Sequence, residues 1–347
     1  MAMRTLSERE LNRTLLARQF LLGRVRAPLT RTIERVGGLQ TQYSPSGYVG
    51  LWSRLEGFER SALTRALERK SVIQATVLRA TIHMVTRADY VSWTAAVRDA
   101  RRTWWLRATR AERDEAEMEE VAARVTELLN AGPLRRAEIV ERLGLDPTSF
   151  NGVGLWVDLV RVPPSGTWGR PRADLYALAE RWLGRPVEAD PEAGRDLLVR
   201  RYLGAFGPAS RKDVAGWAGL PISALEPSFS RLALRTFRDE AGRELVDNPR
   251  APLPAADTPA PPRFLPVWDA SLLVHARRTG IVPEEHRPLI FNTKTPQSVP
   301  TFLVDGRVAG TWRFEGGTVR TTPFSPLRRS VARELADEAA RLAAFMA

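Results

Sequence analysis

One pattern occurs twice in the chain, as VAARVTELLNAGPLRRAEIVERL at residues 121–143 and as DLLVRRYLGAFGPASRKDVA at residues 196–215. Each time, an apolar-periodic helix runs into a Gly-Pro pair, a short basic segment follows, and the next helix opens with an acidic residue, Glu138 or Asp213. Glycine at a helix end and an acidic side chain in the next first turn are typical stop and start signals. The repeat therefore predicts two copies of a small helix-turn-helix unit.

A β-hairpin is predicted after each copy. The first copy is followed by strand-like residues 159–162, a Pro-Pro-Ser-Gly turn, and further short segments at 167–170 and 175–178. The second copy is followed by strand-like residues 232–237 and 244–246, with a glycine-containing turn between them. Two strands joined by a turn after two or three helices is the order of elements in a winged helix.

The N-terminal segment follows the same plan without the Gly-Pro pair. Its periodicity predicts helices at Glu8–Leu22 and Leu29–Leu39 and a third around Gly47–Leu55, and the alternation in Ala75–Val85 predicts a hairpin. The fold class expected from the sequence is therefore α+β, with three tandem winged-helix domains.

The C-terminal part has a different composition. Residues 248–263, NPRAPLPAADTPAPPR, are rich in Pro and Ala and predict a linker. Short strand signals separated by Asp-Gly and Gly-Gly turns at 264–325 predict a small β-rich, barrel-like domain, and Ser330–Met346 an amphipathic helix. The expected domains are residues 1–110, 111–187, 188–250 and 251–347.

The charge balance favours an anionic partner. The net charge is +12, and only three of the 52 basic residues are lysines. The guanidinium group grips phosphate with two parallel hydrogen bonds and stacks on bases. A GC-rich genome also explains the ratio of arginine to lysine, although it does not explain the positive excess. Nucleic acid is therefore the expected partner, with a membrane surface a distant second.

Several classes of chemistry have no motif in the chain. There is no cysteine, and the three histidines, at positions 83, 275 and 286, show no paired metal-ligand spacing. A phosphate-cradling glycine loop, a dinucleotide fingerprint and a Gly-x-Ser-x-Gly elbow are also absent. We expect neither a metal nor a cofactor.

The expected location is the cytoplasm. No apolar stretch approaches the length of a membrane span, and the first residues show no secretory signal. A dimerisation helix is not evident either, so we expect a monomer that does not associate with membranes.

The segment Gln40-Thr41-Gln42 lies at the end of the second expected helix, after a Gly-Gly pair. On a helix, side chains two residues apart diverge, whereas in an extended segment they lie on the same side. In the extended case the two amides can hold one small object, such as a water molecule. The alternative is a polar helix end that faces solvent, and two glutamines alone do not decide between them.

Candidate DNA contacts lie on the expected wings and basic turns. His83 is expected as an exposed wing residue near a phosphate, with a partly buried histidine as the alternative. The basic segment around Trp168 is expected to probe a groove or to stack on a disturbed base. The candidate DNA contacts are Arg79, His83, Arg161, Trp168, Arg170, Arg172, Arg211 and Lys212.

Four segments of the chain resemble the AlkZ-like family of winged-helix DNA glycosylases. They are GLQTQ at 38–42, LRATIHMV at 78–85, VRVPPSGTW at 160–168 and VDGRVAGTW at 304–312. Together they span nearly the whole chain. One departure is Trp268-Asp269-Ala270, where the family pattern leads us to expect Phe-Asp-Asn.

The resemblance implies three tandem winged helices in a C-shaped body, closed by a β-rich domain. It also implies a monofunctional glycosylase in which Gln40 and Gln42 are catalytic. Members excise alkylated purines from double-stranded DNA, such as N7-alkylguanine and N3-alkyladenine. Several protect producers of DNA-alkylating natural products, including cross-linking ones.

Two alternatives fit the charge and the repeats. The first is a winged-helix transcription regulator in which Gln40 and Gln42 only contact DNA. The second is a lesion-binding protein without catalytic activity, built on the same scaffold. Three units plus a β-rich domain in one chain, with no evident dimerisation helix, fit the regulator less well.

Overall fold

The structure is a computed structural model that describes residues 3–109, 114–184, 186–273, 280–292 and 297–347. Helices and strands are both abundant, so the expected α+β class is confirmed. Among the described residues the strands form four sheets, and the largest has six strands. None of the described helices combines the length and the apolar character needed to cross a bilayer.

The N-terminal segment contains helices and a hairpin near the expected positions, but the predicted extension of the first helix to Leu22 is wrong, because the helix ends at Arg18 and Phe20 takes a left-handed backbone angle. The elements are β1 (Thr5–Leu6), α1 (Glu8–Arg18), α2 (Leu29–Arg35), β2 (Leu39–Gln40), α3 (Pro45–Trp52), α4 (Arg60–Glu68), β3 (Val72–Thr76), β4 (Ile82–Thr86) and α5 (Arg87–Ala108). The predicted extension of the second helix to Leu39 is wrong, because Gly37 and Gly38 both take left-handed backbone angles. The amide of Gly38 closes the helix by donating to the Ile33 carbonyl at 2.9 Å.

The first copy of the repeat and its hairpin follow. The elements are α6 (Glu115–Leu129), β5 (Leu134–Arg135), α7 (Arg136–Leu143), α8 (Pro147–Val153), β6 (Leu159–Arg161), β7 (Leu175–Leu178) and α9 (Ala179–Leu183). Residues 167–170 are not a strand. Strand β3 of the first hairpin pairs with β6 of the second, with Gln74 opposite Arg161, so the two hairpins form one continuous sheet.

The second copy of the repeat packs against α5 through its first helix. Its elements are α10 (Pro191–Phe206), α11 (Arg211–Ala218), α12 (Ile222–Arg231), β8 (Arg235–Asp239) and β9 (Glu244–Asp247). The predicted acidic residues are confirmed in both first turns: Asp213 accepts a hydrogen bond from the Ser210 amide at 3.2 Å, and Glu138 accepts one from the Arg135 amide at 2.8 Å. Trp93 of α5 packs edge-to-face on Trp217 of α11 in the largest apolar core.

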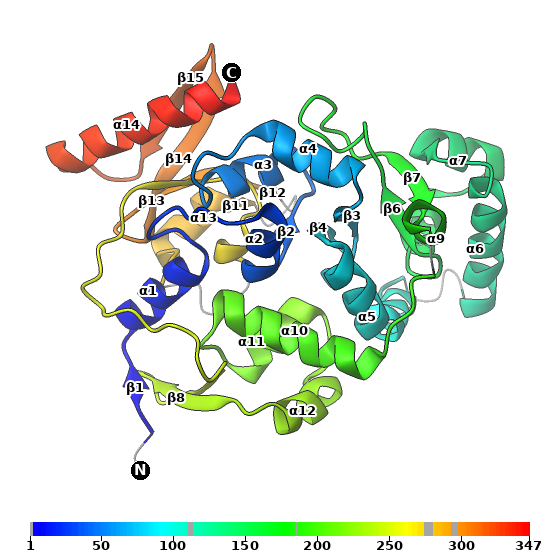
Figure 1. Ribbon diagram of the computed structural model, residues 1–347, viewed down its shortest axis with the longest axis horizontal. Helices are drawn as coiled ribbons and strands as arrows, with labels where there is room; N and C mark the ends of the chain where they lie inside the picture. Colours follow the sequence, from blue (N-terminus) through cyan, green and yellow to red (C-terminus); the bar gives the residue numbers. More distant parts are fainter. Residues whose placement is uncertain (1–2, 110–113, 185, 274–279, 293–296) are drawn as a thin grey trace.

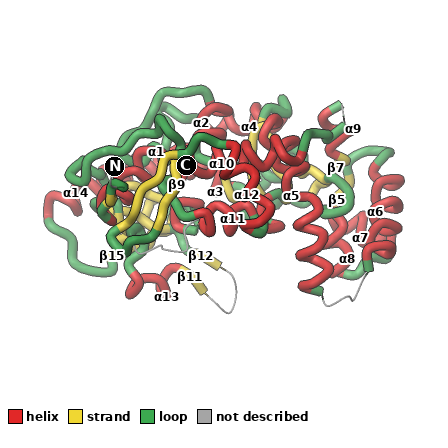
Figure 2. The backbone as a smooth tube through the Cα atoms, turned by 90° about the horizontal axis from the view of Figure 1, so that it is seen from below, coloured by secondary structure: helices red, strands yellow, loops and turns green. Residues whose placement is uncertain are grey.

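The C-terminal part is rich in strands, as predicted. Its elements are β10 (Arg263–Leu265), α13 (Arg287–Ile290), β11 (Phe291–Asn292), β12 (Gln297–Ser298), β13 (Thr301–Val304), β14 (Arg307–Glu315), β15 (Thr318–Pro323) and α14 (Arg329–Met346), with short 3-10 turns at Ala270–Leu272 and Glu284–His286. Strands β10, β13, β14 and β15 form an antiparallel sheet beside α14, at the opposite end of the molecule from α6 and α7 (Figures 1 and 2). Leu335 and Leu342 of α14 are buried in a core that also contains Val49 and Trp52 of α3.

A buried ion pair ties this C-terminal part to the first segment. Arg54 donates to both carboxylate oxygens of Asp269 at 2.9 Å, and to Gln19 and Ser271. Burial alone would raise the pKa of Asp269, but the charge and hydrogen bonds of Arg54 and those of Ser271 hold that pKa below its usual value. Asp269 is therefore an ionised structural partner of Arg54.

Removing this carboxylate is expected to destabilise the protein strongly. Asp269→Ala leaves a buried guanidinium uncompensated, which costs about 3–5 kcal/mol. Since the pKa of Asp269 is lowered, its stabilisation is present above the ordinary carboxyl pKa and is lost as the pH falls through the folded value. Urea unfolding at neutral and acidic pH measures both effects. Glu56→Ala, which removes an exposed pair with Arg26, is the matched control and should change the unfolding midpoint little.

Candidate active site

The turn between α2 and β2 places Gln40 in the sheet. A Cβ on Gly37 would lie 2.8 Å from Phe206 and one on Gly38 would lie 2.9 Å from Val85, and both positions have positive φ. Only glycine fits such positions without strain. The chain therefore leaves the helix sharply, and Gln40-Thr41 enters as extended backbone, with the Thr41 amide bonded to the Ile82 carbonyl at 2.7 Å.

Gln40 is almost fully buried, with 9% of its surface exposed. It lies directly opposite His83 in the pairing of β2 with β4. Its side-chain Oε1 accepts a hydrogen bond from Nη2 of Arg79 at 3.0 Å. The first glutamine of the motif is therefore not a solvent-facing helix end but part of a packed polar cluster with Arg79 and His83.

Arg79 lies in the turn between β3 and β4, in a short 3-10 segment at Leu78–Ala80. Arg79 and Ala80 both have left-handed backbone angles, with φ of 49° and 54°. Non-glycine residues adopt this region at a cost of roughly 1 kcal/mol each. Nη1 of Arg79 donates to the Trp217 carbonyl, and burial lowers the pKa of Arg79 to about 10, so the group stays charged at neutral pH.

The expectation of an exposed His83 is wrong, and the alternative of a buried histidine holds. Only 3% of its surface is exposed, and its Nδ1 lies 3.0 Å from the Thr81 carbonyl. Burial, and secondarily the charge of Arg79, lower the pKa of His83 to about 3. The ring is therefore neutral at physiological pH, and because a carbonyl only accepts hydrogen bonds, Nδ1 carries the proton.

Gln42, unlike Gln40, is exposed. It lines a pocket of about 280 Å³ between the β3–β4 turn, helix α8 and strands β6 and β7. The polar side chains that line this pocket with Gln42 are Thr76, Thr81, Asn151, Arg161 and Tyr176. None of the described residues that line it is Asp or Glu. The pocket therefore offers amide, hydroxyl and guanidinium groups, without a carboxylate base.

Arg161 contributes to the pocket wall but is already engaged by its neighbours. It donates to Thr76 Oγ1 and to Tyr176 Oη, both at 3.1 Å, and to the Ala173 carbonyl at 3.2 Å. The pairing of β6 with β7 places Arg161 opposite Tyr176. Tyr176 and Asn151 were missed from the sequence. Aligning the two predicted strands in antiparallel register would have found Tyr176, whereas Asn151 carries no comparable signal.

Trp168 does not lie at an exposed tip, so the expectation that it stacks on a disturbed base has no support in this geometry. Its ring packs edge-to-face against Tyr48 and Phe345, with centroid distances of 5.6 and 5.7 Å. The guanidinium of Arg60 lies 4.8 Å from its centroid. Trp168 therefore joins the second hairpin to α3 and α14.

The remaining candidate contacts are at the surface. Arg170, Arg172 and Lys212 are exposed. Arg211 is also exposed, but it pairs with Glu226 at 3.0 Å, and Arg172 pairs with Asp174 at 3.3 Å. These side chains are available for phosphate contacts, which are made by flexible cations on a protein surface.

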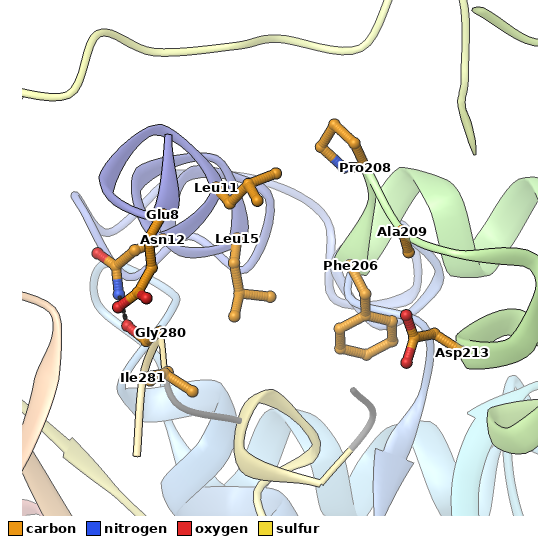
Figure 3. Close-up of a pocket in the computed structure, with 10 residues that line it drawn as sticks. All are labelled: Glu8, Leu11, Asn12, Leu15, Phe206, Pro208, Ala209, Asp213, Gly280 and Ile281. Atoms are coloured by element: carbon orange, nitrogen blue, oxygen red, sulfur yellow. Dashed lines mark hydrogen bonds between the residues drawn. The ribbon is translucent and has the colours of Figure 1, made fainter. Parts of the chain in front are cut away.

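A separate cavity lies between α1 and the start of α11 and contains neither glutamine (Figure 3). Leu15, Phe206 and Ile281 line it, and on the side of α1 Asn12 donates to the Gly280 carbonyl at 2.8 Å. Its volume of about 70 Å³ has room for a few water molecules only. Within the part of the chain that the structure describes, no three His, Asp or Glu side chains gather in a way that could hold a metal ion.

Comparison with known proteins identifies the family. The family model described as "DNA glycosylase AlkZ-like" matches residues 33–345, which include both glutamines and all residues that line the pocket beside Gln42. The chain belongs to the AlkZ-like DNA glycosylase family. An AlkZ-like relative in Streptomyces sahachiroi, named "Interstrand DNA cross-link repair glycosylase", is 24% identical over 94% of this chain and 93% of its own length. The solved structure of the S. sahachiroi DNA glycosylase AlkZ superposes with a TM-score of 0.82 at 20% identity, covering 98% of this chain and 97% of the other.

The protonation of His83 can be measured directly. We expect its ring resonances in NMR spectra to show no titration between pH 8 and pH 5, because the pKa is lowered to about 3. The unfolded state takes up this proton below about pH 6.5, and the folded state does so only near pH 3. Between these two pH values, protonation of His83 in the unfolded state lowers the free energy of unfolding by up to about 1.4 kcal/mol for each unit that the pH falls. His83→Phe assigns the resonance. A titration midpoint near 6.5 would show that the ring is solvated and would contradict the structure.

Proposed function

We propose that this protein is a monofunctional DNA glycosylase that hydrolyses the N-glycosidic bond of cationic alkylated purines, with Gln40 and Gln42 as its catalytic residues. N7-alkylguanine is the main substrate class, with N3-alkyladenine as a second. The observation that carries the proposal is the pocket beside Gln42, which has amides and hydroxyls but no carboxylate among its described lining residues. Such a site suits a base that is already activated for departure.

The chemistry requires little from the enzyme. Alkylation at N7 of guanine places a positive charge on the base. When the C1′–N9 bond breaks, its electron pair neutralises that charge, and the base leaves without protonation. The sugar develops oxocarbenium character at C1′, as in glycoside hydrolysis. A water oxygen then bonds to C1′, and its proton passes to solvent.

Positioning of that water is the role proposed for the glutamines. Amide oxygens accept hydrogen bonds from the attacking water and stabilise developing positive charge, although an amide does not act as a strong base. His83 does not supply an acid, because burial keeps its ring neutral. The site is therefore limited to leaving groups that need no protonation.

The architecture proposed for this activity is three tandem winged-helix domains, at residues 1–110, 111–187 and 188–250, followed by a barrel-like β-rich domain at 251–347. The recurrence of a helix pair followed by a hairpin supports it, since β3–β4, β6–β7 and β8–β9 each follow helices. Exposed Arg170, Arg172 and Lys212 are proposed as phosphate contacts, together with Arg211. The proposed partner is double-stranded DNA. The protein itself is proposed to be a monomer in the cytoplasm.

The substrate range is proposed to include bulky and cross-linking adducts of natural products, with a role in self-resistance. The name of the S. sahachiroi relative supports this, because it refers to repair of interstrand cross-links. Gln42 is exposed at the surface, which also suits an adduct too large for a tight base cavity.

The first test is base release. A duplex with one N7-methylguanine is incubated with the protein and then cleaved at abasic sites with alkali. We expect cleavage with the wild type and a loss of about 100-fold or more in single-turnover rate for Gln40→Ala and for Gln42→Ala. Asn130→Ala, which truncates an amide at the end of α6, is the control. Tight duplex binding without base release would instead identify a regulator or a lesion sensor.

The second test concerns the charge of the leaving base. A duplex containing uracil presents an uncharged base that needs protonation or a stronger electrostatic site to depart. We expect no measurable uracil release under conditions in which N7-methylguanine is fully excised. Release of uracil at a comparable rate would show that the enzyme activates its leaving group, and the proposed restriction to cationic adducts would be wrong.

A further inference from the structure

The contact between Arg79 and Gln40 has no role in the function proposed above. A guanidinium group has hydrogen-bond donors and no acceptor. The partner of Arg79 Nη2 must therefore be the oxygen of the Gln40 amide, at 3.0 Å, and not its nitrogen. Although an amide is often ambiguous by a 180° flip, this partner determines the orientation. Oε1 of Gln40 faces Arg79, and Nε2 of the same amide points away from Arg79.

Arg79 is itself held firmly. Its Nη1 donates to the carbonyl of Trp217, so the two terminal nitrogens of the guanidinium have partners on different elements. Arg101 of α5 holds the start of the turn between β3 and β4, because it donates to the carbonyls of Thr76 at 2.8 Å and Val77 at 3.2 Å. A Cβ on Gly219, at the end of α11, would lie 3.3 Å from the Arg79 amide nitrogen, so α11 packs closely against this backbone.

The backbone of the turn adds an independent observation. Arg79 and Ala80 are consecutive residues in the left-handed region, although neither is glycine. Such a conformation persists only where surrounding contacts impose it. These contacts come from α5, α11 and β2, and their combined effect is to aim the Arg79 guanidinium at Gln40.

We propose that Arg79 is a positioning residue that fixes the amide of Gln40, so that its Nε2 donors and not its oxygen are presented to the reacting nucleotide. Gln42 then supplies the oxygen that accepts from the attacking water. This inference rests on the proposed glycosylase function and deepens it, because, of the two amide oxygens proposed above, only that of Gln42 contacts the water, while Gln40 contributes N–H donors. It also replaces the expectation that Arg79 binds a DNA phosphate, since its two terminal nitrogens donate to the Trp217 carbonyl and to Gln40 within the protein.

The two amides can be told apart by replacing each with a carboxylate. Gln40→Glu keeps an oxygen for Arg79 but has no N–H donor, so we expect its rate on N7-methylguanine to fall as far as that of Gln40→Ala. Gln42→Glu keeps an acceptor for water, so we expect it to retain most of the activity that Gln42→Ala loses. The opposite ranking of the two Glu variants would overturn the assignment of roles.

A double-mutant cycle tests whether Arg79 acts through Gln40. Arg79→Met is expected to lower the single-turnover rate by about 100-fold and to leave affinity for undamaged duplex unchanged. In a Gln40→Ala background the same change should cost nothing further. Arg79→Lys keeps the charge but has one terminal nitrogen in place of two, so it should be faster than Arg79→Met and slower than the wild type. Thermal unfolding of each variant verifies that it is folded.

Arg172→Met is the matched control, because it removes an exposed arginine outside this cluster. It should weaken duplex binding for every sequence, reduce the salt slope by about 1, and remain additive with Gln40→Ala. If Arg79→Met behaves like this control, Arg79 is a phosphate contact and the positioning role is wrong. If the wild type releases no base at all, the glycosylase proposal fails first, and the inference fails with it.

Discussion

The pairing of strand β3 with strand β6 is the constraint on which the site depends. It consists of two residue pairs, Gln74 with Arg161 and Ala75 with Val160. These pairs join the hairpin that carries Arg79 to the hairpin that carries Arg161 and Tyr176. The pocket beside Gln42 lies across this junction, with residues from both hairpins in its walls. The pairing therefore fixes the position of the pocket wall formed by β6 and β7 relative to the β3–β4 hairpin.

Much of the local structure could be predicted from the sequence, because its signals are local. The Gly-Pro pairs, the capping acids Glu138 and Asp213, and the hairpin turns act within a few residues, and the corresponding helices and strands are found where they were expected. Gln40-Thr41-Gln42 drew attention through its spacing, although only the family resemblance separated it from a polar helix end.

Other features depend on contacts between distant residues and gave no local signal. Pairing of β1 with β8 and of β3 with β6 joins segments that are far apart in the sequence. His83 has the alternating pattern of an exposed wing, yet tertiary packing buries it, and Trp168 has the setting of a basic tip, yet it packs on Tyr48. A pattern of alternation shows which side chains share a face, but not whether another element covers that face.

The contacts between Arg54 and Asp269 and between α3 and α14 have a consequence for fragments of the chain. Arg54 is neutralised by Asp269, 215 residues further along the chain, and the apolar face of α3 is covered by α14. A fragment that ends before Asp269 therefore carries Gln40 and Gln42 on a segment in which Arg54 has no carboxylate partner and α3 has an uncovered apolar face. We therefore expect that a fragment cut before Asp269 folds poorly and aggregates through this exposed apolar face.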